Sequence, residues 1–155
     1  MHIALWEPEI PPNTGNIARL CAATATPLHL IGRLGFHLDD RHLKRAGLDY
    51  WPHVTIHCHT TFAEFESWWL TQGFDPGRIF VLTAHAAIPY TRIAFQQGDC
   101  VVFGTETRGL PPEVLTRYGD RAFVIPMPSG KVRSLNLATA AGIVLYEALR
   151  QLQSW

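Results

Sequence analysis

The pattern of apolar and polar positions divides the chain into short apolar runs and longer segments with helical spacing. The short runs are rich in β-branched and aromatic residues and are bounded by turn residues, which indicates buried strands. They predict strands at residues 2–6, 28–31, 54–57, 79–82, 101–103 and 123–125. The longer segments predict five helices. The first follows Asn13, three span Asp39–Ala46, Thr61–Thr71 and Pro111–Tyr118, and the last begins at Ser134.

Strands that alternate with helices predict an α/β fold with a mostly parallel sheet, here of six strands. A chain of 155 residues suits a single hydrophobic core. We find no repeat, linker or low-complexity segment, so residues 1–155 are expected to form a single domain.

The predicted C-terminal helix carries the longest amphipathic pattern in the chain. Its apolar face consists of Leu137, Ala140, Ala141, Val144, Leu145, Ala148, Leu149 and Leu152. Ser134 stands where an N-cap residue belongs, and Asn136 falls in the first turn. Ser134 either only caps the helix or also helps to hold a polar ligand. By the same reasoning Asn13 is expected to cap the first long helix.

Three loops follow strands of the predicted parallel sheet, and ligands of such sheets bind beyond the carboxyl ends of the strands. The loops are the one after Leu82, residues 104–110 and residues 126–134. Glycines in the last two allow backbone to approach a ligand closely. This reasoning places four polar residues near a pocket: Glu106, Ser134, Asn136 and, less directly, Arg19. A solvated helix arginine is the alternative for Arg19.

Two common catalytic motifs are absent. Gly130-Lys131 fails as a phosphate loop, because Val132 stands where Ser or Thr is needed and Ile125 where the first glycine belongs. The chain has no Gly-x-Ser-x-Gly sequence, so a serine hydrolase is unsupported.

A zinc site is also disfavoured. His57 and Cys58 point to opposite faces of a strand, and no second Cys or His pair has zinc-site spacing. We therefore expect no metal. The three cysteines, Cys21, Cys58 and Cys100, are isolated in apolar settings, which predicts reduced, buried thiols.

Thirteen basic and thirteen acidic residues cancel, so a nucleic-acid surface would have to be a local patch. Arg33, Arg41, Lys44 and Arg45 stand close to Tyr50 and Trp51, although such a cluster is also typical of a solvated face. No apolar run approaches the ~20 residues of a membrane span, and no secretory signal is visible. A cytoplasmic protein with no membrane partner is expected.

Three blocks of the chain carry a family resemblance. They are residues 13–19 (NTGNIAR), residues 103–110 (FGTETRGL), and residues 125–127 (IPM) followed by residues 134–138 (SLNLA). Together they resemble the SPOUT class of S-adenosylmethionine-dependent RNA methyltransferases, in its SpoU branch. Residues 7–13 (EPEIPPN) and 45–51 (RAGLDYW) are similar to the small subfamily that methylates the wobble ribose of tRNA.

The resemblance implies a deep trefoil knot in the C-terminal part of the fold, a rare exception to ordinary connectivity. It also implies that S-adenosyl-L-methionine lies bent in the knot, is held mainly by backbone groups, and leaves as S-adenosyl-L-homocysteine. The matching cofactor-binding positions are Leu82, Gly104, Gly109, Ile125, Met127, Ser134, Leu135 and Asn136.

The catalytic set implied by the resemblance is Asn13, Arg19, Glu106, Ser134 and Asn136. An arginine pKa above about 12 makes Arg19 a poor general base. We expect Arg19 to orient the ribose hydroxyl and to stabilise the alkoxide. Glu106 is expected to fix either the cofactor amino group or a neighbouring loop.

The implied partners are tRNA, at its anticodon stem-loop, and a second copy of the chain. Candidate phosphate contacts are Arg33, Arg41, Lys44, Arg45, Lys131 and Arg133. Gly142, Ile143 and Tyr146 form a second stripe on the last helix, which belongs either to a dimer interface or to the core. Two alternatives stay open: a SpoU-type enzyme for another tRNA position or rRNA, and a knotted binding module without catalysis. The sequence leaves open which tRNAs are used, and whether nucleotide 34 is C or U.

Overall fold

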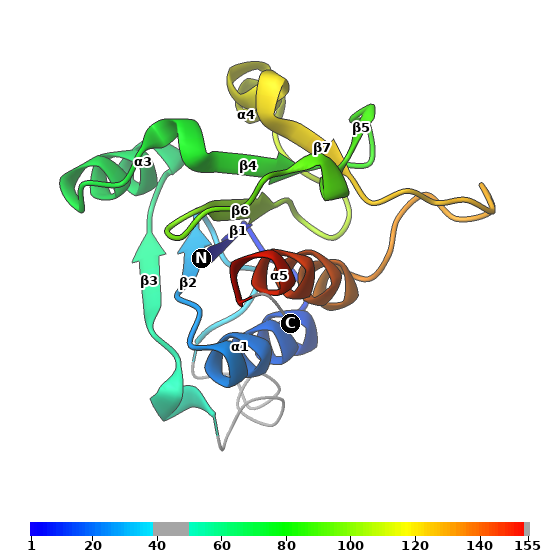
Figure 1. Cartoon of the computed structure of the whole chain (residues 1–155). Helices are drawn as coiled ribbons and strands as arrows, with labels where there is room; N and C mark the ends of the chain where they lie inside the picture. The colour runs from blue at the N-terminus through cyan, green and yellow to red at the C-terminus, as the bar shows by residue number, and fades with distance from the viewer. Residues whose placement is uncertain (39–49, 154–155) are drawn as a thin grey trace.

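The computed structural model describes residues 1–38 and 50–153. Within them, one sheet contains seven parallel strands in the order β3-β2-β1-β6-β4-β7-β5 (Figure 1). The strands are β1 (His2–Trp6), β2 (Leu28–Ile31), β3 (Ile56–His59), β4 (Ile79–Leu82), β5 (Ile88–Pro89), β6 (Cys100–Phe103) and β7 (Ala122–Val124). The predicted α/β class and the parallel sheet are confirmed.

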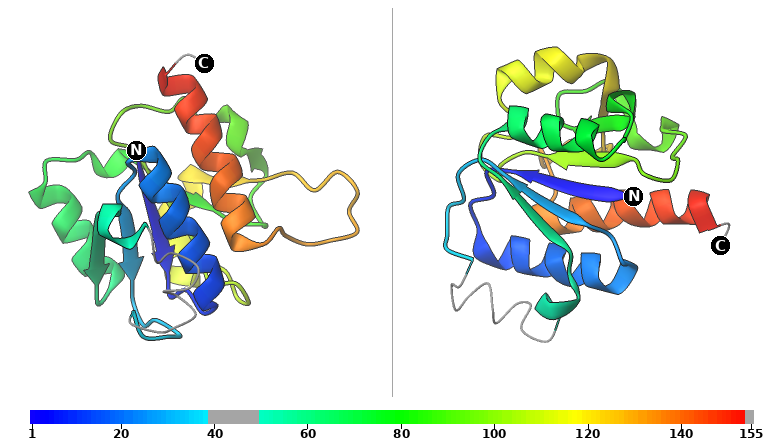
Figure 2. Two further views of the ribbon diagram at one scale, coloured as in Figure 1. Left: turned by 90° about the horizontal axis from the view of Figure 1, so that it is seen from below. Right: turned by 90° about the vertical axis from the view of Figure 1, so that its left-hand side faces the viewer.

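Helices cover both faces of the sheet. The longer helices are α1 (Pro11–Thr24), α3 (Phe62–Thr71), α4 (Pro112–Tyr118) and α5 (Leu137–Gln153). Figure 2 shows α1 and α5 on one face and α3 and α4 on the other. In the described part of the chain, the connections also contain single-turn 3₁₀ helices, namely η1 (Trp51–His53), η2 (Pro76–Arg78), η3 (Tyr90–Arg92) and η4 (Gly119–Arg121). No helix among the described residues is long and apolar enough to cross a membrane.

Several predicted boundaries are wrong. The sheet has seven strands and not six, because β5 is a two-residue edge strand that carries too little pattern to be seen in the sequence. β3 begins two residues later than predicted, and α5 begins at Leu137, three residues after Ser134. The predicted helix over Asp39–Ala46 lies outside the described residues. The trefoil knot stays a prediction.

Alternate residues of the strands pack into two hydrophobic cores, one on each face of the sheet. On β1, Ile3 and Leu5 pack in the core beneath α1 and α5, whereas Ala4 packs in the core beneath α3 and α4. This explains why the strands are apolar throughout, since both faces of a covered parallel sheet are buried. The predicted apolar face of α5 is confirmed, with Ala141, Val144, Leu145 and Ala148 fully buried.

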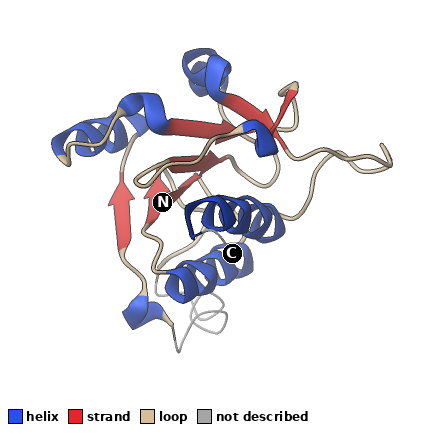
Figure 3. Cartoon of the chain, in the orientation of Figure 1, coloured by secondary structure: helices blue, strands red, loops and turns tan. Residues whose placement is uncertain are grey.

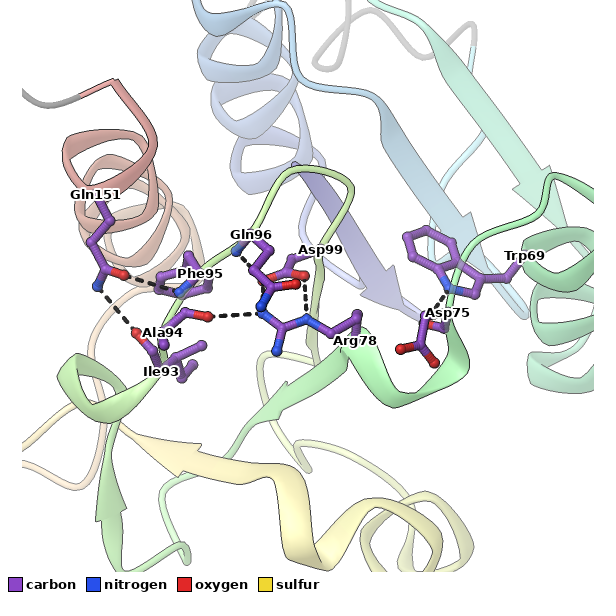
Figure 4. Close-up of polar contacts among 9 residues, drawn as sticks. All are labelled: Trp69, Asp75, Arg78, Ile93, Ala94, Phe95, Gln96, Asp99 and Gln151. Carbon is purple, nitrogen blue, oxygen red and sulfur yellow. Dashed lines mark hydrogen bonds and ion pairs between the residues drawn. The ribbon is translucent and has the colours of Figure 1, made fainter.

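A polar network joins the amino ends of β4 and β6 to the C-terminal part of α5 (Figure 4). The carboxylate of Asp99, fully buried, accepts hydrogen bonds from Arg78 Nε at 2.7 Å and Nη2 at 2.6 Å. Gln151 of α5 accepts a hydrogen bond from Phe95 N and donates one to Ile93 O. The C-terminal part of α5 is thus fixed near the amino ends of the strands. The start of α5 and the loop before it lie at the carboxyl ends of the strands.

A tight hairpin follows β6. Thr105 and Gly109 exchange both backbone hydrogen bonds at 3.0 Å. Gly104 lies directly beneath this bridge: a Cβ atom there would be 2.1 Å from the carbonyl carbon of Gly109 and 2.3 Å from the nitrogen of Leu110. Such distances are far inside van der Waals contact, so only glycine fits at position 104.

A chain of buried histidines joins β1, β2 and β3. His2 Nδ1 lies 3.0 Å from His29 Nε2, and His29 Nδ1 lies 3.0 Å from His59 Nε2. Burial, with a smaller contribution from the neighbouring histidines, lowers the pKa of His29 to about 2; burial also lowers the pKa of His2 to about 4. Burial lowers the pKa of His59 as well, so all three rings are neutral at pH 7 and hydrogen-bond to one another. Within the described residues no group of three His, Cys, Asp or Glu side chains could hold a metal ion.

We expect this histidine chain to make the protein sensitive to mild acid. The folded pKa values lie below the ordinary 6.5, so below pH 6.5 the unfolded chain binds protons that the folded chain does not. The stability is fully present above pH 6.5 and is lost as the pH falls towards about 4, by at most ~1.4 kcal/mol per histidine and pH unit.

Urea unfolding at pH 7.5, 6 and 5 measures this loss. His29→Gln, which keeps a donor and an acceptor but does not titrate, should flatten the dependence of the free energy of unfolding on pH. His53→Gln, at an exposed position, is the control and should keep the wild-type slope. An unchanged slope in His29→Gln would show that the acid sensitivity arises elsewhere.

Gly104→Ala should destabilise the hairpin, because the added methyl group overlaps backbone that cannot move away independently. The expected loss is about 1–3 kcal/mol in the free energy of unfolding, as for other overpacked sites. Thermal unfolding measures it. Gly119→Ala is the control, because a Cβ atom there meets no atom within 4 Å. Equal losses in the two variants would contradict the steric explanation.

Candidate active site

A cavity of about 560 Å³ lies at the carboxyl ends of β4, β6 and β7. The hairpin after β6 forms one wall, and the segment that joins β7 to α5 forms another. This segment has no helix or strand and projects from the body of the protein (Figure 3). The position agrees with the rule that parallel sheets bind ligands beyond the carboxyl ends of their strands.

All eight positions that match the family's cofactor site line this one cavity. They are Leu82, Gly104, Gly109, Ile125, Met127, Ser134, Leu135 and Asn136. They come from four separate parts of the sequence, and the fold brings them together. Many have no polar side-chain atom, so a polar ligand here would be bound largely through backbone N–H and C=O groups.

Three polar side chains form a hydrogen-bonded chain at the cavity. Asn13 Nδ2 donates to Glu106 Oε1 at 3.2 Å, and Asn136 Nδ2 donates to Asn13 Oδ1 at 2.9 Å. Because a carboxylate only accepts, the bond to Glu106 fixes the amide orientation of Asn13, and through it that of Asn136. The chain thus links α1, the hairpin after β6 and the start of α5.

Asn136, and not Ser134, caps α5. Asn136 Oδ1 accepts hydrogen bonds from Ala138 N at 2.9 Å and Thr139 N at 3.3 Å. The prediction that Ser134 caps the helix is wrong; Ser134 is exposed and lines the cavity. The predicted N-cap at Asn13 is also wrong, because α1 already begins at Pro11 after the cap residue Ile10. Asn13 is instead buried in the first turn.

Glu106 fixes a neighbouring loop, one of its two expected roles. Its carboxylate accepts hydrogen bonds from Glu9 N at 2.8 Å and Ile10 N at 3.0 Å, besides the bond from Asn13. The segment between β1 and α1 is therefore tied to the hairpin after β6. Charge-assisted bonds of this kind are stronger than neutral ones.

Arg19 is not among the residues that line the cavity. It is exposed on α1, and its guanidinium lies 4.7 Å from the centre of the Tyr50 ring, a cation–π contact. The structure therefore brings Asn13, Glu106, Ser134 and Asn136 together and leaves Arg19 on the adjacent surface of α1.

The predicted RNA-binding residues are spread over the surface. Arg133 lines the cavity, and Lys131 is exposed on the same segment. Arg33 is exposed in the loop after β2. Arg41, Lys44 and Arg45 lie outside the described residues.

Sequence reasoning missed other residues around the cavity, namely Ile10, Thr83, Ala84, His85, Thr107 and Arg108. All but Ile10 lie in loops named from the sequence, after Leu82 and at residues 104–110, so their position was the available signal. Ile10 lies in the segment between β1 and α1, which was not named as part of the pocket. The expectation that every cysteine is buried is wrong for Cys58, which is exposed on the edge strand β3, whereas Cys21 and Cys100 are buried.

Comparisons with known proteins identify the family of the chain. A sequence model described as the SpoU rRNA Methylase family matches residues 1–146. The chain is 48% identical to a tRNA (cytidine(34)-2'-O)-methyltransferase of Methylovorus glucosotrophus, over 96% of this chain and 94% of that protein.

Solved structures are similar as well. One, from a study of 2'-OH methylation of C/U34 on tRNA, has a TM-score of 0.89 and 48% identity and covers 99% of this chain and 97% of its own. Another is an rRNA methyltransferase of Sinorhizobium meliloti with S-adenosylmethionine bound, with a TM-score of 0.84 and 26% identity over 97% of this chain and 56% of its own. The chain belongs to the SpoU methylase family.

Proposed function

We propose that this protein transfers the methyl group of S-adenosylmethionine to the ribose 2'-hydroxyl of nucleotide 34, the wobble cytidine or uridine, of tRNA. The observation that carries the proposal is the single cavity lined by all eight cofactor positions that the family resemblance implies. The full-length similarity to a tRNA (cytidine(34)-2'-O)-methyltransferase supports the substrate. A tRNA substrate also fits a cytoplasmic protein.

The cavity suits S-adenosylmethionine in size and in the chemistry of its lining. Small-molecule sites are mostly apolar with a few well-placed polar groups, and about 560 Å³ lies in their usual range. When bound, S-adenosylmethionine supplies an electrophilic methyl group on a positively charged sulfur. The residues assigned to hold it are Leu82, Gly104, Gly109, Ile125, Met127, Ser134, Leu135 and Asn136.

The protein's main contribution is to position the ribose hydroxyl in line with that methyl group. A held near-attack geometry contributes ~7–11 kcal/mol in well-oriented reactions. Asn13 and Asn136 are suited to fix the geometry, because their amide orientations are set by Glu106 and by the start of α5. Ser134, exposed at the cavity, is assigned to orient the ribose.

The ribose oxygen forms a bond to the methyl carbon, the carbon–sulfur bond breaks with its electron pair left on sulfur, and the hydroxyl proton is released. We assign Arg19 to stabilise the developing alkoxide or a substrate phosphate, because a guanidinium stays charged and cannot act as a ready base.

A dimer would allow a neutral chain to build a basic RNA groove from both copies. Lys131, Arg133 and Arg33 are exposed or line the cavity and are assigned to phosphates, together with Arg41, Lys44 and Arg45. Gly142, Ile143 and Tyr146 of α5 remain at least partly accessible, which suits them to the interface between the copies.

Incubation of the chain with total tRNA and labelled S-adenosylmethionine tests the proposed function. Mapping of the labelled nucleotide should place a 2'-O-methyl group at position 34. Methylation of a base, of another ribose, or of ribosomal RNA only would contradict the proposal.

Arg19→Ala should reduce methyl transfer to tRNA to background while S-adenosylmethionine still binds, because Arg19 lies outside the cavity. Single-turnover methylation and calorimetric titration of the cofactor measure the two properties separately. Arg92→Ala, at an exposed position in η3 on another part of the surface, is the control and should keep full activity. Normal turnover by Arg19→Ala would refute the assigned role.

A further inference from the structure

Two glutamates bind each other's loops next to the cavity. Glu106 holds the backbone of Glu9 and Ile10, as described above. In return, the carboxylate of Glu9 accepts hydrogen bonds from Thr107 N at 3.3 Å and from Thr107 Oγ1 at 2.8 and 3.0 Å. We call Glu9, Glu106 and Thr107 the glutamate clamp.

Thr107 occupies the tip of the hairpin that forms one cavity wall. The Thr105–Gly109 bridge closes the base of the hairpin, and Arg108 N donates to Thr105 Oγ1 at 3.0 Å. These two contacts lie within the hairpin and do not tie its tip to the rest of the protein. Two glutamates do so: the carboxylate of Glu106 binds the segment between β1 and α1, and the carboxylate of Glu9, which does not line the cavity, binds Thr107, which does.

Glu9 is itself firmly anchored. Its backbone N–H is bound by Glu106, and Gly35 packs so closely that a Cβ atom there would lie 2.9 Å from Glu9 Cα. Gly35 N also donates to Pro8 O at 3.0 Å. The backbone of Glu9 is therefore fixed. Its carboxylate, hydrogen-bonded to Thr107, holds the tip of the hairpin in place relative to that backbone.

Glu9 could instead serve to neutralise the charge of Arg108, but this is the weaker explanation of its role. The guanidinium of Arg108 is 3.9 Å from the Glu9 carboxylate, and its side chain is 79% exposed. Exposed pairs at this distance contribute little. The stronger interaction is the hydroxyl hydrogen bond of Thr107, shared between the two carboxylate oxygens of Glu9 at 2.8 and 3.0 Å, with a longer bond from Thr107 N at 3.3 Å.

We propose that Glu9 is a positioning residue for the cofactor: through Thr107 it holds the hairpin after β6 in the shape that S-adenosylmethionine needs. This inference rests on the proposed use of the cavity. When a binding-competent shape is populated only in part, the apparent affinity falls by that fraction. Loss of the clamp should therefore weaken cofactor binding, although Glu9 itself does not line the cavity.

Calorimetric titration of the full chain with S-adenosylmethionine, without RNA, tests the proposal. Glu9→Ala should raise the Kd about threefold to tenfold, because the hydrogen bonds that it removes are exposed. Glu9→Gln, which keeps the shape but loses the charge, should fall between wild type and Glu9→Ala. Glu113→Ala removes an exposed glutamate from α4 and should stay within about twofold of wild type.

A double-mutant cycle shows whether Glu9 acts through Thr107. Thr107→Val should also raise the Kd, and the double variant Glu9→Ala/Thr107→Val should bind about as weakly as Glu9→Ala. Thr107→Ser, which keeps the hydroxyl, should bind better than Thr107→Val. With tRNA present, Glu9→Ala should raise the KM for the cofactor and leave the KM for tRNA within about twofold, a pattern that general destabilisation would not give.

The proposal is overturned if folded Glu9→Ala or Glu9→Gln binds S-adenosylmethionine as tightly as wild type. Independent effects of Glu9→Ala and Thr107→Val would overturn it too. If the chain binds cofactor, responds to Glu9→Ala, and yet fails to methylate position 34, only the proposed substrate is refuted. A wild-type chain that binds no S-adenosylmethionine overturns both.

Discussion

The carboxylate of Glu106 is the interaction on which the cavity depends. β1 and β6 are paired in the sheet, with Leu5 opposite Phe103, so the loops that follow them begin side by side. The pairing of the strands does not determine how these loops run beyond that point. Glu106 fixes the two loops to each other, because it accepts hydrogen bonds from two backbone amides and from Asn13 on the other loop. One side chain thereby places the start of α1, and through Asn13 and Asn136 the start of α5, against the hairpin that carries Glu106 itself.

The sheet could be predicted where local pattern and tertiary structure agree. The strands at 2–6, 28–31 and 79–82 are short apolar runs that become buried on both faces, and their predicted bounds are correct. β5 could not be predicted, because two residues beside β7 gain their strand geometry from the neighbour and not from their own sequence. The cavity was located correctly for a topological reason, since all three of its loops follow parallel strands.

Helix caps were the weakest part of the prediction, for a physical reason. Ser134 and Asn136 are both good cap residues, and the local sequence cannot show which one receives the free amides of the first turn. Asn13 is also a good cap residue, but the prolines at 11 and 12 already suit the first turn of α1, and its amide is used by Glu106. Contacts between residues 93 and 123 positions apart in the chain decide such cases. The same holds for Glu9, whose partner Thr107 is 98 residues away: it lies in the block 7–13 that carries the family resemblance, but the block itself indicates no role for it.

The site combines a rigid part with an adaptable one. The walls that would hold a cofactor consist of backbone in tight contact, as at Gly104, and of side chains whose orientations are fixed by several hydrogen bonds. Two exposed cations are held weakly: Arg19 stacks on Tyr50 at the surface of α1, and Arg108, which lines the cavity, is 3.9 Å from its carboxylate partner. Contacts of this kind contribute about 1 kcal/mol or less when exposed, so they can be exchanged for phosphate at little cost. A small, invariant cofactor needs a preformed site, whereas a large and flexible RNA is better met by charges that can move. The division between rigid walls and weakly held cations therefore suits the two different substrates of one reaction.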